Sequence, residues 1–196
     1  MSIKKVRCYS ETFRNEMKLG NLMTNESCDK DFDKEKMKQV AHYIINQCGH
    51  LENFGKTVLF KLLYFADFNY YELTEKKMTG ESYYRLDHGP APCHFDLIEK
   101  ELQAEEKILK GKAKLGKYDQ YRYSIRRDFS LDRLSAMELM TIEKVIKWYS
   151  GMNATEISAL SHMDMPYKAT KDKEIIDYEL VFYRDPALSV REYCDD

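Results

Sequence analysis

The stretch at residues 58–68 most constrains the fold of this chain, because apolar side chains occur on nearly every face of the helix that it predicts. A surface helix repeats its apolar residues every three or four positions and keeps one face polar, which this stretch does not. The sequence therefore predicts a helix at residues 56–71 in the centre of a domain. Three polar residues within it, Lys61, Tyr64 and Asp67, share one side by their spacing. We expect them to be structural, with the head of the lysine reaching water or a carboxylate.

Further helices are predicted around this central helix, and capping residues indicate where they begin. Asp33 precedes an apolar stripe and is suited to a helix N-cap. Two pairs of residues, Ser135 with Glu138 and Asn153 with Glu156, have the spacing of capping boxes. The predicted helices comprise residues 34–48, 92–106, 135–150 and 153–160, and a last short turn of helix is expected to open at Pro166.

Two segments lack a helical period. Residues 108–126 combine turn-like glycines with an alternating stretch, which predicts a β-hairpin. Gly89 and Pro90 are expected to form a tight turn, with Gly89 at positive φ and a helix beginning at Pro92. The eight glycines and four prolines are about half the average usage, which favours long helices over a turn-rich sandwich. The predicted fold class is mainly α (α+β), a compact helical domain around a central apolar helix with a small β-hairpin.

The 196 residues suit one compact domain with short appendages. Polar residues and asparagines interrupt any apolar period in residues 1–32, which predicts a loosely ordered or docked N-terminal arm. The domain is expected at residues 33–184, followed by an irregular tail at residues 185–196. Residues 29–33 are similar to the opening of a calcium loop, but the glycine and glutamate that such a loop needs are absent. We interpret them as a solvated acidic run.

Charge, cysteine content and hydropathy limit the classes of partner. A net charge of −2 does not favour nucleic acid as the main partner. No run of eighteen apolar residues occurs and the N-terminus lacks the apolar run of a secretory signal, so no membrane association is expected. The five cysteines are scattered without a Cys-x-x-Cys pair, which predicts reduced thiols and a cytoplasmic protein. No cofactor is expected, and the oligomeric state is left open.

Cys93, with His88 and His94, is the strongest candidate for chemistry. A thiol at a helix N-terminus beside an imidazole could serve as a nucleophile. The same three side chains, together with His162, could supply four zinc ligands. The competing interpretation places them around a tight turn with neither role, and we prefer it because no oxyanion donor or orienting carboxylate accompanies them. We therefore expect no catalytic and no metal-binding residue, with a Cys/His-dependent enzyme as the weaker alternative.

The predicted hairpin carries aromatic and basic side chains in alternation. Tyr121, Arg122 and Tyr123 follow one another, and Arg126 and Arg127 come shortly after. Such a mixture is typical of surfaces that bind single-stranded nucleic acid, so a nucleic-acid-binding phage or regulatory protein is an alternative function. Tyrosine and arginine are also enriched in protein interfaces. Tyr121, Arg122 and Tyr123 are therefore the candidate contacts with a protein partner.

Several motifs occur in an order that resembles a known family. They are FKLLYFAD at residues 60–67, TGE at 79–81, YRLDHGP at 84–90, then the hairpin, LSH at 160–162 and PY at 166–167. In this order they are similar to the SocA-like antitoxin domain, also called the Panacea domain and often labelled a phage-associated protein, over about residues 33–184. Ala91 stands where the family usually has valine, and Tyr167 where tryptophan is common.

The resemblance implies a helical antitoxin that neutralises a cognate toxin by direct protein–protein binding, without enzymatic activity. It also implies a second possible partner, a cytosolic protease, to which a member of the family delivers its toxin. The matched family positions, most of which we expect to be scaffold residues, are Lys61, Tyr64, Gly80, Gly89, Pro90, Ser161 and His162. Because polar groups at a helix end need partners, we expect Ser161 and His162 to bond inward to the core around Tyr64.

Overall fold

A computed structural model describes residues 31–115, 118–128 and 130–191. Residues 1–30 of the predicted arm, which include part of the acidic run, and residues 192–196 of the predicted tail lie outside this description. The last two residues of the arm contact the domain. The Asp31 carboxylate lies 2.9 Å from the Lys77 amine, and the Phe32 ring stacks on His94 at 4.2 Å.

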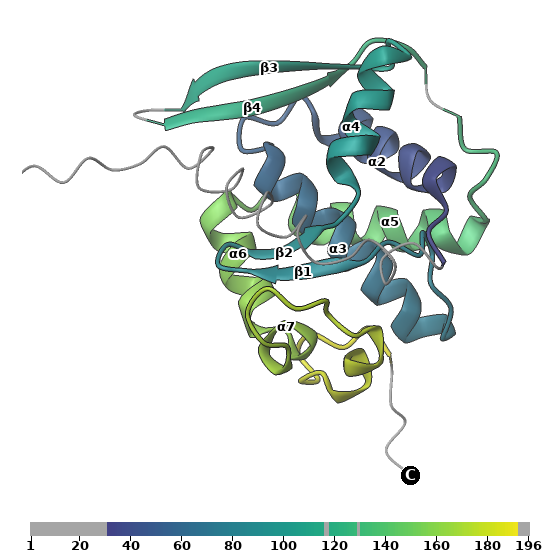
Figure 1. Ribbon diagram of the computed structural model, residues 1–196, viewed down its shortest axis with the longest axis vertical. Helices are drawn as coiled ribbons and strands as arrows, with labels where there is room; N and C mark the ends of the chain where they lie inside the picture. The colour runs from purple at the N-terminus through teal and green to yellow at the C-terminus, as the bar shows by residue number, and fades with distance from the viewer. Residues whose placement is uncertain (1–30, 116–117, 129, 192–196) are drawn as a thin grey trace, which may run out of the picture.

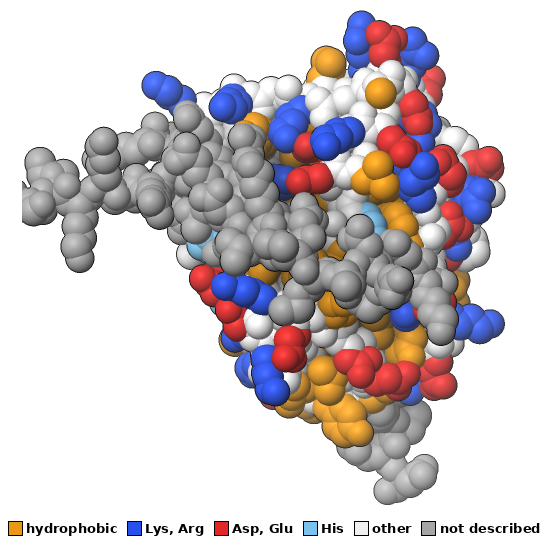
Figure 2. Space-filling model, viewed as in Figure 1, with side chains coloured by type: hydrophobic (Ala, Val, Ile, Leu, Met, Phe, Trp, Pro, Cys, Tyr) orange, Lys and Arg blue, Asp and Glu red, His pale blue; other side chains and the backbone are white. Residues whose placement is uncertain are grey.

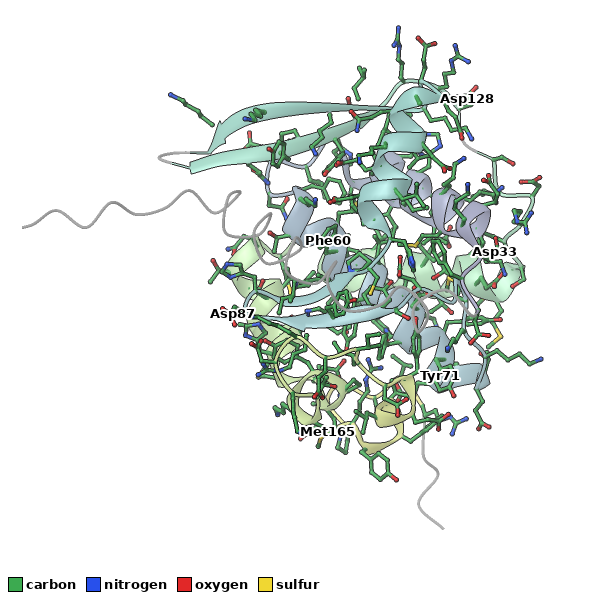
Figure 3. All side chains as sticks on the ribbon, in the orientation of Figure 1. Asp33, Phe60, Tyr71, Asp87, Asp128 and Met165 are labelled. Atoms are coloured by element: carbon green, nitrogen blue, oxygen red, sulfur yellow. The ribbon has the colours of Figure 1, made fainter. Side chains whose placement is uncertain are left out.

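Helix α3 (Lys56–Thr74) runs through the middle of the molecule, as its apolar sequence predicts (Figure 1). All its residues from Val58 to Asn69 are buried, including Phe60, which Figure 3 labels. The helix continues past the predicted end at residue 71 and stops before Glu75, which has a left-handed φ of 59°. Because every face of α3 is removed from water, it needs neighbours all around it.

Three helices supply much of this cover: α2 (Lys34–Cys48), α5 (Ala136–Tyr149) and α6 (Ala154–Met163). Their predicted caps are confirmed. The Asp33 side chain accepts a hydrogen bond from the Lys36 backbone N–H at 2.9 Å. Ser135 and Asn153 each form a complete capping box with the glutamate three residues later. Helix α6 extends beyond the predicted residue 160 to Met163, so that His162 lies in its last turn.

A hairpin that the sequence analysis did not predict lies in front of α3 in Figure 1, with α5 behind α3. It consists of β1 (Tyr83–Leu86) and β2 (Gly89–Pro92), paired antiparallel with Leu86 opposite Gly89. The chain therefore turns at residues 87–88, not at Gly89 and Pro90 as predicted; Figure 3 labels Asp87 at this turn. Gly89 does have the predicted positive φ, 94°.

The helix predicted at residues 92–106 is shorter than expected. Pro92 is the last residue of β2, and α4 (Phe95–Ala104) begins three positions later with His94 as its N-cap. Proline is compatible with a helix start but also with a short edge strand, where its missing N–H needs no partner. Because β2 pairs with β1, Pro92 adopts the strand and not the helix start.

The hairpin predicted at residues 108–126 is confirmed as β3 (Ile108–Leu115) and β4 (Tyr118–Ile125). It lies at one end of the molecule beside α2 and α4 (Figure 1). Ile108 and Tyr123 anchor it, since both side chains are 1% exposed and belong to the hydrophobic core.

The C-terminal elements cover the other end of the molecule (Figure 1). Helix α7 (Met165–Ala169) carries Pro166 in its first turn, as predicted, and a 3₁₀ helix, η2 (Tyr178–Tyr183), follows. The Tyr178 ring stacks on Phe68 of α3 at 4.1 Å. The predicted fold class, mainly α with a small sheet component, is confirmed. Within the described ranges, none of the helices has the length and apolar character needed to span a membrane.

Candidate functional site

The motif residues of the sequence converge on the interior around α3, and Lys61 is the most unusual of them. Its side chain is completely buried, and its amine donates a hydrogen bond to the Pro90 carbonyl at 2.9 Å. None of the ion pairs among the described residues involves Lys61, so the expected carboxylate or water partner is replaced by a backbone carbonyl. Burial lowers the pKa of this amine to about 7.

Gly89 packs directly against both Lys61 and Ser161. A Cβ atom at position 89 would lie 2.6 Å from the Ser161 Oγ and 2.7 Å from the Lys61 Cε, so a side chain has no room there. The positive φ of Gly89 also favours glycine. The Ser161 hydroxyl is fully buried and donates to the Ser158 carbonyl at 2.8 Å, within its own helix. Residues from α3, β2 and α6 thus meet at one buried point.

His162 lies beside this point and is only partly buried. Its ring stacks on Tyr167 at 4.6 Å, and its Nε2 atom makes no hydrogen bond within the described part of the chain. Burial, followed by the charges of Lys61 and Arg85, lowers the pKa of His162, which favours the neutral imidazole. The prediction that Ser161 and His162 bond to the core around Tyr64 is therefore wrong, because one bonds within its helix and the other stacks on α7.

Tyr64 instead belongs to a second buried polar cluster, which we call the arginine cluster: Tyr64, Asn69, Glu72, Asp164 and Arg184. The Tyr64 hydroxyl donates to Asp164 at 2.8 Å. Arg184 makes two hydrogen bonds to the same carboxylate, at 2.9 and 2.8 Å, and one to Glu72 at 2.6 Å. Burial disfavours the charged form of Arg184. The neighbouring Asp164 carboxylate outweighs this effect and keeps the pKa of Arg184 above its usual value.

Sequence reasoning missed Arg184, Asp164 and Glu72. Each is an ordinary charged residue in the sequence, and the two carboxylates come from α3 and from the boundary of α6 and α7. The one signal available was a glutamate near the end of an otherwise apolar helix. It indicated a buried charge but gave no information about its partner.

Asp67 holds the segment that leads into β1. It accepts hydrogen bonds from the Thr79 backbone N–H at 3.0 Å, the Thr79 hydroxyl at 2.7 Å and the Tyr83 hydroxyl at 2.6 Å. Burial raises the pKa of Asp67 to about 6. The adjacent Gly80 has φ of 69°, and a Cβ there would lie 1.9 Å from the Asp31 carbonyl oxygen. Gly80 therefore allows the chain of residue 31 to pass close to this loop.

The residues proposed for metal binding do not form a metal site in the described chain, and His94, one of the imidazoles proposed beside the Cys93 nucleophile, has a carboxylate neighbour. The His94 Nδ1 atom lies 2.8 Å from Glu81 Oε1, and its ring stacks on Phe32, so Glu81 is a carboxylate that orients this imidazole, which the sequence did not reveal. Cys93 precedes α4 and is partly exposed. Across residues 31–115, 118–128 and 130–191, no group of three or more His, Cys, Asp or Glu side chains is placed to hold a metal ion.

The hairpin residues expected to contact a partner have different environments. Tyr123 is 1% exposed and its hydroxyl donates to Glu99, which corrects its assignment to a contact surface. Arg122 is half-buried and donates to the Glu52 and Gly49 carbonyls at 2.6 and 3.3 Å. Tyr121 is half-buried under the amine of Lys110, 4.3 Å from its ring.

Two of the basic residues considered for nucleic-acid binding form ion pairs within the protein. Arg126 and Arg127 are both exposed and both pair with Glu106, at 3.3 and 2.5 Å. Where the face in view is drawn in colour, Figure 2 shows Lys and Arg interspersed with Asp and Glu. Glu106 therefore offsets part of the positive charge of Arg126 and Arg127 at this end of the hairpin.

Comparison with known proteins gives one positive result. A family model described as "Antitoxin SocA-like, Panacea domain" matches residues 59–168, more than half of the 196 residues. The matched range contains both the Lys61 region and Tyr64, and it ends before Arg184. No curated protein and no solved structure matches the chain significantly.

Proposed function

Because the chain belongs to the SocA-like antitoxin family with the Panacea domain, we propose that it neutralises a cognate toxin by binding it in a stable, non-covalent complex. The family match over residues 59–168 is the observation that carries this proposal. Neutralisation by binding needs a stable scaffold and an exposed contact surface, and it needs no catalytic step.

The burial of the motif residues supports a scaffold role for them. Lys61, Tyr64 and Ser161 are each 0% exposed, so none can touch a partner without local unfolding. These residues preserve the positions of α3, β2 and α6 relative to one another. Contacts that select one toxin must then come from exposed positions outside the motifs. Tyr121 and Arg122, which remain partly exposed, belong to that set of candidates.

The test is co-expression with the product of the adjacent gene, with cell growth and co-purification as the two measurements. We expect that product alone to arrest growth, and this protein to restore growth and to co-purify with it in a fixed ratio. An unrelated protein expressed to the same level is the control. A harmless neighbour, or a toxin that still arrests growth in the presence of abundant folded protein, would contradict the proposal.

Delivery of the toxin to a cytosolic protease is a narrower form of the same function. The co-expression experiment separates the two mechanisms through the amount of toxin. Occlusion leaves the toxin present at full level in an inactive complex, whereas delivery lowers its level and requires the protease. Both mechanisms begin with the same binding step, so both are consistent with the proposal.

A further inference from the structure

Helix α5 carries an exposed apolar stripe that the fold does not use. Met137, Met140 and Trp148 are 47%, 57% and 47% exposed. At 100° per residue these positions, with Lys144 between them, fall within about 80° of arc, on one face of the helix. The stripe extends about 16 Å along the helix axis, which is three helical turns. We call these four residues the α5 stripe.

The α5 stripe differs from the other exposed apolar residues of the described chain. Eight large hydrophobic side chains are exposed there, and three of them lie in this one stripe. The other five come from five different elements: Leu97, Leu109, Ile125, Met163 and Tyr183. Single exposed apolar residues are normal on a protein surface, whereas aligned ones rimmed by charge mark interaction sites.

Two lysines, one within the stripe and one beside it, form no ion pair with the described residues. Lys144 and Lys147 are exposed, and neither makes an ion pair or hydrogen bond to a described residue. Glu143, on the exposed side of α5, accepts a hydrogen bond from the Tyr43 hydroxyl at 3.0 Å and is not within ion-pair distance of either lysine. Glu138, on the buried side of α5, pairs with Lys36 at 2.9 Å. A partner on this face therefore meets methionine and tryptophan surface with two free cations.

From this arrangement, and resting on the proposed antitoxin function, we infer that the α5 stripe is the docking site for an amphipathic helix of the toxin whose apolar stripe is flanked by Asp or Glu. A row of three apolar side chains and one lysine, three turns long, is complementary to the face of another helix that combines apolar and acidic side chains. Acidic flanks would pair with Lys147, which lies beside the stripe, and with the amine of Lys144, whose flexible stem extends out of the apolar row, and would accelerate association. Trp148 is the natural anchor, because tryptophan dominates interface energies, and the methionines adapt to the shape of the partner.

Trp148 is the single tryptophan of the chain, which provides a direct probe of the stripe in the full-length protein. In the isolated protein we expect its fluorescence to be readily quenched by acrylamide. When the protein is labelled with 5-fluorotryptophan, we expect one ¹⁹F resonance, and we expect it to shift when the purified product of the adjacent gene is added. If Trp148 is already shielded in the isolated protein, the stripe is covered by a second copy or by another segment of this chain, and the inference is overturned.

A pair of matched variants tests whether the stripe binds the toxin. M140S/K144E removes one exposed methionine and reverses one charge on α5. L97S/K100E makes the same kind of change on the exposed face of α4, where Leu97 is 45% exposed. We expect M140S/K144E to weaken the complex tenfold or more and L97S/K100E to change its affinity less than twofold. Unchanged melting temperatures in both variants show that the scaffold is intact.

The ionic part of the inference has its own measurement. Between 50 and 300 mM NaCl the affinity of the wild-type complex should fall several-fold, and in K144E/K147E this salt dependence should be lost or reversed. A salt-independent wild-type complex would overturn the acidic character of the partner helix.

The outcomes also separate this inference from the proposed function. If the wild-type protein neutralises the toxin and M140S/K144E does so equally well, the docking site is elsewhere while the antitoxin function holds. If the wild-type protein neither neutralises nor binds the neighbouring product, the antitoxin function itself fails.

Discussion

At the scale of single residues, Lys61 shows how the fold accommodates a polar group in its centre. A protonated lysine amine has three N–H donors, and the hydrogen bond observed for Lys61 goes to one carbonyl, that of Pro90. A charged amine in this environment has lost its hydration without gaining a counter-ion. Because hydration is lost, the pKa of Lys61 falls to about 7, and the neutral amine becomes accessible near neutral pH.

This pKa predicts a pH dependence of stability. The amine has a pKa of about 7 in the folded protein and 10.5 as its ordinary value. Between these two pH values the unfolded chain binds the proton and the folded chain does not, so the free energy of unfolding rises with pH. Below pH 7 the amine is charged in both states, and the full destabilisation by the buried charge is present.

The measurement is urea unfolding of the wild-type protein and Lys61→Met at intervals from pH 6.5 to 9.5. The wild type is expected to gain up to about 1.4 kcal/mol per pH unit relative to the variant. Titrating groups that do not interact with Lys61 cancel in the difference, and His162, which does, has a pKa below 6.5, the start of the pH range. Parallel stability curves would show that Lys61 titrates normally and is not buried as described.

Residue roles were predictable from the sequence only where chemistry and location are both local. The N-cap of Asp33 and the two capping boxes involve residues within one helical turn, and all three are confirmed. The partner of Lys61 is 29 positions away in sequence, and the carboxylates of Arg184 are 20 and 112 positions away. Composition and spacing carry no information about such pairs, which depend on how the elements pack.

At the scale of elements, the β1–β2 hairpin depends on Gly89. This residue faces both Lys61 and Ser161 with no space for a Cβ atom, and its φ is 94°. Gly89→Ala is therefore expected to destabilise the protein by at least about 1 kcal/mol, from backbone strain and from displacement of its neighbours.

Gly151→Ala is the matched control for this prediction. A Cβ at position 151 would meet no atom within 4 Å, and its φ is not positive. Its stability should stay within about 0.5 kcal/mol of the wild type. Thermal or denaturant unfolding of both variants gives the comparison, and equal stabilities would contradict the close packing described at β2.

The elements predicted correctly are those with a long, consistent period. Helices α2, α3, α5 and α6 and the β3–β4 hairpin all have one, and all are confirmed. The β1–β2 hairpin has strands of four residues, too short for a period-two pattern, and its second strand contains two prolines. The hairpin forms because β2 covers a broad apolar surface of α3. This is a tertiary effect, and a local sequence pattern does not predict it.

At the scale of the whole molecule, the chain beyond the family match completes the core. Arg184 reaches from the segment after η2 to Asp164, Asn69 and Glu72, and its side chain is 1% exposed. The Glu72 carboxylate also accepts a hydrogen bond from the Val190 backbone N–H at 3.3 Å. The arginine cluster therefore joins the C-terminal segment to the last part of α3.

This arrangement predicts that the C-terminal segment is required for the stability of the whole domain. Arg184→Met leaves the buried carboxylates of Asp164 and Glu72 without their cation, and we expect a loss of about 3–5 kcal/mol in the free energy of unfolding. The stability of Arg184→Lys, which keeps the charge but not the bidentate geometry, should fall between that of this variant and that of the wild type.

Arg191→Met is the control, because Arg191 pairs with Glu75 at 2.8 Å on the surface, where such a pair contributes about 0–1 kcal/mol. Urea unfolding measures all three variants. A loss for Arg184→Met no larger than that for Arg191→Met would show that the C-terminal segment is peripheral and that the domain is stabilised without it.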